Sequence, residues 1–176
     1  MSRRKIFILL TKFPSTGANV LHRLTGCGYT HASIGLEEDM NTFYSFVTKG
    51  FIVEKLTRYL KPDRPPFPCL LYEIAVPERT YREIGALLSD FVRKQPLLRY
   101  NKLGVVLGLL HIARKRENHY FCSQFVAEIV RRGQAAPLVK DSALYFPKDL
   151  QTLRGTRELF RGDLLGLAKR YRLAGG

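Results

Sequence analysis

Short runs of hydrophobic residues alternate with polar turns through the first half of the chain. A continuous apolar run at residues 6–10 predicts a buried strand. Segments 30–36 and 42–47 are rich in strand-forming residues, and a polar turn at 38–41 lies between them. Another almost continuous apolar segment, 69–76, follows a proline-rich loop. These patterns predict strands that are joined by tight turns.

Helical spacing dominates the second half of the chain. Segment 78–95 predicts a helix because its apolar residues recur at helical intervals, with charges on the opposite face. Segment 100–118 predicts a helix that trails into a basic loop, and 121–132 predicts another helix. A shorter helix is expected at 14–26 and a last strand at 158–167. With strands early and helices late, the pattern predicts an α+β fold.

Length and cysteine content limit the class of protein. A chain of 176 residues suits one domain, so residues 1–176 are expected to form a single unit. The three cysteines cannot all pair with one another, and their spacing fits no zinc site. We therefore expect free thiols and a reducing compartment. The basic start is a poor secretory signal, and the apolar run at 103–113 is too short to span a bilayer, so a cytoplasmic location is expected.

The net charge of +14 favours an anionic partner, whether nucleic acid, acidic lipid or another acidic polymer. A merely solvated basic surface would have the same composition. The sequence has no recognisable helix-turn-helix, zinc or RNP motif, and its basic residues are not concentrated in one block. Nucleic acid is therefore the less favoured partner, and an anionic membrane surface remains open.

Cys122 lies in the first turn of the helix expected at 121–132. Helix N-termini stabilise thiolate and lower the cysteine pKa from about 8.5 to about 3.5–7.5, and the same N–H groups can bind an oxyanion. Burial as a small core residue is the alternative. Of the four histidines, His31 opens a predicted strand, where a catalytic base would be rigidly aimed.

Two motifs together resemble a known family. "YTHASIGLEEDMNTFYSFVTKGF" followed later by "YFCSQFVAEIVRRG" is similar to the circularly permuted branch of NlpC-type papain-fold cysteine hydrolases. That branch includes YiiX-like proteins and, more distantly, the lecithin:retinol acyltransferase group. The resemblance covers about residues 5–165. It implies a papain-like fold, in which an antiparallel sheet packs against helices that include the cysteine-bearing helix.

Carried over to this chain, the resemblance implies Cys122 as nucleophile and His31 as base. The third, polar position falls on Ser45, with Tyr44 and Glu37 as alternatives. A serine can orient the imidazole but adds no charge to stabilise imidazolium. No cofactor or metal is expected for this chemistry.

Three functions are therefore expected, in decreasing order. The first is a thiol hydrolase that cleaves an amide or ester bond in a peptide, amide or lipid substrate through an acyl-enzyme. The second is an acyltransferase or thioesterase that uses the same dyad at an anionic membrane. The third is a basic nucleic-acid-binding protein without enzymatic activity.

Overall fold

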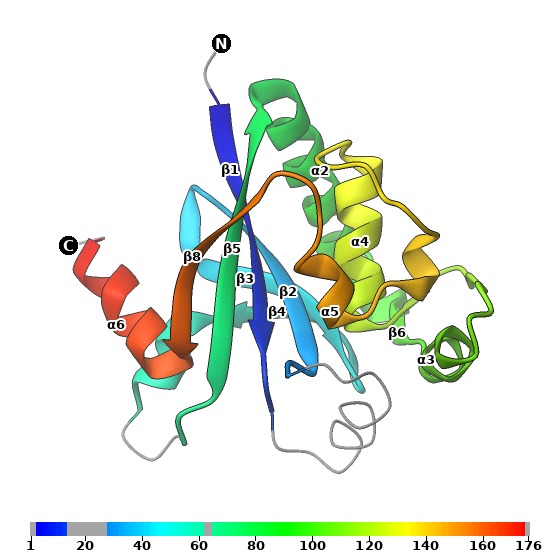
Figure 1. Cartoon of the computed structure of the whole chain (residues 1–176), viewed down its shortest axis with the longest axis horizontal. Coiled ribbons are helices and arrows are strands. Elements are labelled where there is room, and N and C mark those ends of the chain that lie inside the picture. The colour runs from blue at the N-terminus through cyan, green and yellow to red at the C-terminus, as the bar shows by residue number, and fades with distance from the viewer. Residues whose placement is uncertain (1–2, 14–27, 62–64, 175–176) are drawn as a thin grey trace.

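The computed structural model describes residues 3–13, 28–61 and 65–174 (Figure 1). A six-stranded antiparallel sheet, in the order β4-β3-β2-β1-β5-β8, forms its centre. The strands are β1 (Arg3–Thr11), β2 (His31–Leu36), β3 (Asp39–Val47), β4 (Gly50–Lys55), β5 (Pro68–Pro77) and β8 (Thr156–Asp163). The α+β class expected from the sequence is confirmed.

Helices lie on both faces of this sheet, with α2 (Glu78–Arg93) and α4 (Cys122–Arg132) on one side and α6 (Leu164–Ala174) on the other (Figure 1). A small parallel pair, β6 (Arg99–Tyr100) and β7 (His119–Tyr120), precedes α4. The helical elements are η1 (Leu56–Leu60), α2 (Glu78–Arg93), η2 (Gln95–Leu97), α3 (Lys102–Leu109), α4 (Cys122–Arg132), η3 (Ser142–Leu144), α5 (Pro147–Leu150) and α6 (Leu164–Ala174). None of the helices in the described part of the chain is both long enough and apolar enough to cross a bilayer.

The sheet separates two hydrophobic clusters, because successive side chains of a strand point to opposite faces. On β1, Ile6 and Ile8 join the first cluster, which lies under α2 and α4. Phe7 and Leu9 join the second cluster, which is covered by η1 and α6. A strand that is buried on both faces needs a continuous apolar run, which explains the pattern at 6–10.

Most sequence-predicted elements are confirmed, and two differ. The helix expected at 100–118 is much shorter, since α3 ends at Leu109 and His111 turns the chain with φ of 59°. The strand expected at 158–167 ends at Asp163, whose carboxylate accepts the Gly166 N–H at 2.8 Å and so caps α6. The helix predicted at 14–26 lies outside the described residues.

The backbone ladder between β2 and β3 is short. Its described pairs involve Ile34, Gly35 and Leu36, with a register shift between the last two. The start of β2 pairs with β1 instead, where His31 lies opposite Thr11. Towards β3, Ala32 precedes the printed backbone pairs, and its carbonyl oxygen accepts the Ser45 hydroxyl, which positions the candidate site.

Candidate active site

Cys122 is held at the first turn of α4. The turn is fixed because Gln124 Oε1 accepts the backbone N–H of Phe121 at 3.3 Å. Further along the helix, Phe125 and Ile129 are fully buried in the first cluster. The thiol is itself buried, with 4% of the residue exposed. The sequence prediction that Cys122 opens a helix is confirmed.

Backbone donors surround the sulfur. The backbone N–H of Ala32 faces it from β2, and the backbone N–H groups of Ser123 and Cys122 face it from the first turn of α4. Burial nevertheless dominates and raises the pKa of Cys122, while these donors lower it by less. The direction is opposite to the one that a helix N-terminus alone predicts. The resting residue is therefore a neutral thiol at pH 7.

His31, the residue that precedes Ala32, is buried. Its Nε2 atom is inaccessible and has no hydrogen-bond partner among the described residues. Its ring packs against Phe13, with centroids 5.5 Å apart. Burial lowers the imidazole pKa, and the charge of Glu54 opposes this shift. The ring is thus neutral at pH 7, and a buried polar atom without a partner requires an explanation.

The Cys122 thiol and the His31 imidazole lie by different faces of the sheet at the start of β2. Ala32 and Ile34 belong to the first cluster under α4. Strand alternation therefore assigns His31 to the opposite face, where Phe13 packs against the second cluster. No hydrogen bond joins Nε2 to the Cys122 sulfur. The structure brings the thiol to the peptide bond beside His31, and the catalytic pairing of the two residues stays a prediction.

Ser45 is fully buried on β3 and contacts the same residue, Ala32. Its hydroxyl donates to the carbonyl oxygen of Ala32 at 2.5 Å. The hydroxyl and the thiol therefore engage the C=O and the N–H of one residue. This bond positions the strand end that carries His31, whereas the sequence led us to expect a bond to the imidazole itself.

The alternatives for the third position lie elsewhere. Glu37 follows the far end of β2, about 20 Å from His31 at about 3.3 Å per residue, and binds Arg4 at 3.0 Å. Tyr44 packs against the first cluster and stacks on Phe51. Neither geometry allows a contact that would orient the His31 ring.

Tyr100 is a neighbour of the thiol that the sequence did not reveal. Its pKa is raised, first by burial and then by the charge of Cys122. It reaches the site from β6, where the adjacent Asn101 donates to Gln124 Oε1 at 3.4 Å. Tyr120, two residues before Cys122, packs against the rings of Phe46 and Phe91. No local spacing signals the position of Tyr100, because it depends on how β6 pairs with β7.

The other chemistry-bearing residues do not add to the site. Cys69 is buried in the second cluster, and burial raises its pKa to about 12. Cys27 lies outside the described residues. No cluster of three His, Cys, Asp or Glu side chains with metal-binding geometry occurs in residues 3–13, 28–61 and 65–174.

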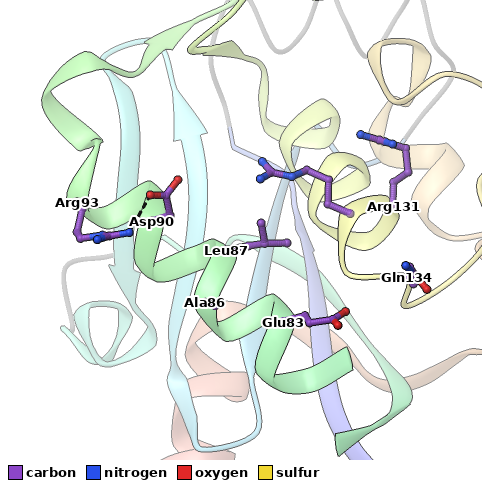
Figure 2. Close-up of a pocket in the computed structure, with 8 residues that line it drawn as sticks. Glu83, Ala86, Leu87, Asp90, Arg93, Arg131 and Gln134 are labelled. Atoms are coloured by element: carbon purple, nitrogen blue, oxygen red, sulfur yellow. Dashed lines mark hydrogen bonds and ion pairs between the residues drawn. The ribbon is translucent and has the colours of Figure 1, made fainter. Parts of the chain in front are cut away.

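A groove of about 670 Å³ lies between α2 and the end of α4 (Figure 2). Its charged residues are largely paired, as in the ion pair of Arg93 with Asp90. Its α4 side is formed by Arg131 and Arg132, about 15 Å along the helix from Cys122 at about 1.5 Å per residue. The groove is therefore separate from the thiol.

No protein-family model matches the sequence, and a search of curated proteins finds no match. Function is therefore inferred from the geometry around Ala32.

Proposed function

We propose that the protein is a thiol-dependent hydrolase of amide or ester bonds, with Cys122 as nucleophile, His31 as base and a permuted papain-like fold. The proposal rests on one observation, which is that the Cys122 thiol and His31 both lie beside the backbone of Ala32. The backbone N–H of Ala32 faces the buried Cys122 sulfur and favours its thiolate form, and the adjacent His31 holds a buried Nε2 without a hydrogen-bond partner among the described residues. An antiparallel sheet under a helix that begins with the nucleophile also supports the proposal.

The resting charges favour general-base catalysis over a preformed thiolate–imidazolium pair. Both groups are neutral, since burial raises the pKa of Cys122 and lowers that of His31. For this step the start of β2 must rotate, so that the imidazole leaves Phe13 on the far face of the sheet and reaches the sulfur. In the tautomer that carries its proton on Nδ1, Nε2 then accepts the thiol proton.

The chemical steps follow from these positions. The sulfur attacks the carbonyl carbon, and the oxyanion is stabilised by backbone N–H groups in the first turn of α4. The C–N or C–O bond breaks, and the imidazolium returns its proton to the leaving group. Water, deprotonated by the same imidazole, then cleaves the thioester and releases the acid, and the imidazolium returns this proton to the Cys122 thiolate. Ser45 acts as a positioning residue by holding the Ala32 carbonyl.

The test is labelling by an acyl-type thiol probe, with the modified cysteine identified by mass spectrometry. Cys122→Ala should abolish labelling at this site, and His31→Ala should come close because nucleophile and base act as a unit. Ser45→Ala should slow labelling about ten- to a hundredfold, or about 1.4–2.7 kcal/mol of barrier. Cys69→Ala, which removes another buried thiol, should change nothing.

Two matched variants separate catalysis from loss of structure. Ser33→Ala removes a buried hydroxyl from the same strand without touching the Ala32 peptide, and should label like the wild type. His111→Ala removes an exposed imidazole and should do the same. If His31→Ala keeps the wild-type rate while it remains folded, the base assignment is wrong. Cys122 would then be a structural core cysteine.

A further inference from the structure

The outer face of α3 carries large aliphatic side chains that the fold leaves uncovered. We call Leu103, Val106, Leu110 and Ile112 the α3 ridge; they are 56%, 54%, 65% and 50% exposed. They recur at helical spacing and in the turn that follows, so they form one surface. Contiguous exposed apolar residues mark interaction sites, whereas isolated ones need no explanation.

The way α3 packs explains why the ridge faces outward. Its inner face is made of Gly104 and Gly108, which are buried. A Cβ on Gly108 would lie 3.2 Å from the Phe146 ring and 3.3 Å from the carbonyl oxygen of Ala143. The helix thus packs on the body through its glycines, so that Leu103 and Val106 face outward while Val105, Leu107 and Leu109 are half-buried. Figure 1 shows α3 at the edge of the molecule, beyond α4.

Positive charge borders the α3 ridge. Lys102 begins the helix, and Arg114 and Arg116 follow the ridge; all three are exposed and have no ion pair among the described residues. Lys115 between the two arginines is already paired, with Glu128 and Asp141. A second copy of the same surface would set these cations against each other. The complementary partner is therefore anionic around an apolar centre.

We propose that the α3 ridge docks the protein onto an anionic lipid bilayer. A convex row of aliphatic side chains inserts into the acyl boundary of a bilayer without needing a preformed groove. Three unpaired cations at its margin suit acidic headgroups, which attract basic residues within a Debye length. Such docking goes beyond the chemistry proposed for Cys122 and does not require it.

Docking would place the thiol close to the bilayer. Phe146, which contacts Gly108 of α3, also stacks on Phe121, the residue before Cys122. The cap of α3, Asn101, bonds to Gln124 in the first turn of α4. These contacts join α3 to the start of α4, the helix that carries the candidate nucleophile.

The first experiment measures binding of the full chain to vesicles of phosphatidylcholine, alone or mixed with phosphatidylserine. The wild type should bind the acidic vesicles more tightly, and added salt should weaken this binding. A triple variant, Leu103→Ser with Val106→Ser and Leu110→Ser, should lose at least about a hundredfold in affinity. Val92→Ser, at an exposed valine of α2, is the matched control and should bind normally.

Charge variants separately test the cations that border the α3 ridge. Arg114→Gln with Arg116→Gln should lose roughly 25-fold for acidic vesicles, or about fivefold per cation. Arg79→Gln with Arg82→Gln removes the same charge from α2 and should have a much smaller effect. Equal losses in the two pairs would show that only net charge matters and would overturn the placement of the surface on α3.

Insertion can be observed directly because the chain has no tryptophan. When vesicles are added, the tryptophan fluorescence of Val106→Trp should shift to shorter wavelength and be quenched by brominated lipid. The fluorescence of Val92→Trp should change in neither way. Cys122→Ala should bind like the wild type, so loss of the proposed chemistry leaves this proposal intact. Three results would overturn it: no vesicle binding by the wild type, normal binding by the triple variant, or a dimer in solution that the triple variant abolishes.

Discussion

Glu128 gives the sharpest prediction about what holds α4 in place. Its carboxylate is almost completely buried on α4 and accepts hydrogen bonds from Arg131 and from the hydroxyl of Ser142, the latter at 2.7 Å. Burial raises its pKa, but Arg131, Ser142 and Lys115 lower it by more, so the pKa falls from 4.5 to about 2. The bond to Ser142 ties the helix to η3. Glu128→Gln would remove the charge and keep the shape.

The expected loss follows from linkage between protonation and folding. The fall in the Glu128 pKa from 4.5 to about 2 corresponds to about 3.4 kcal/mol, at about 1.36 kcal/mol per pKa unit. Since the Arg131 and Lys115 side chains are 50% and 44% exposed, water screens part of this, and about 1.5–3 kcal/mol remains. Because the folded pKa is depressed, this stability is present above the unfolded pKa and disappears as the pH falls to about 2.

The assay is urea unfolding, followed by circular dichroism, of the wild type and Glu128→Gln at neutral pH and at several acidic values. The difference in unfolding free energy should be largest near pH 7 and shrink steadily below about pH 4.5. Glu158→Gln, which removes the carboxylate of an exposed pair with Arg161, should unfold like the wild type. A neutral-pH difference under about 0.5 kcal/mol, or one that does not change with pH, would refute the reasoning.

Three further changes test the core and the thiol. Phe125→Ala should lower the unfolding free energy by about 3–5 kcal/mol because its ring is fully buried, whereas Val92→Ala on the exposed side of α2 should have little effect in the same urea titration. Gly133→Ala should cost about 1–3 kcal/mol in thermal or urea unfolding, since its Cβ would lie 2.3 Å from Ile84. Alkylation of Cys122 by iodoacetamide should still be accelerating above about pH 8.5, because burial raises its pKa. A rate that reaches its plateau at neutral pH would contradict this direction.

Local patterns in the sequence determined the main elements. The run at 6–10 predicts β1 because a strand buried on both faces must be apolar throughout. The periodic residues of 78–95 predict α2 because one stripe of that helix packs on the sheet. The start of α4 at Cys122 follows from the same periodicity. These features depend only on neighbours within a few turns or one strand length, so the sequence by itself carries them.

Only the tertiary structure decided how the candidate site is arranged. Sheet register places Ser45 on the Ala32 carbonyl, and strand alternation turns His31 towards Phe13. The packing of α4 against β2 buries Cys122 so deeply that its pKa rises, although its place in the helix predicts a fall. Each of these outcomes depends on which distant segments meet and how much water they exclude. Neither quantity is encoded in the spacing of residues along the chain.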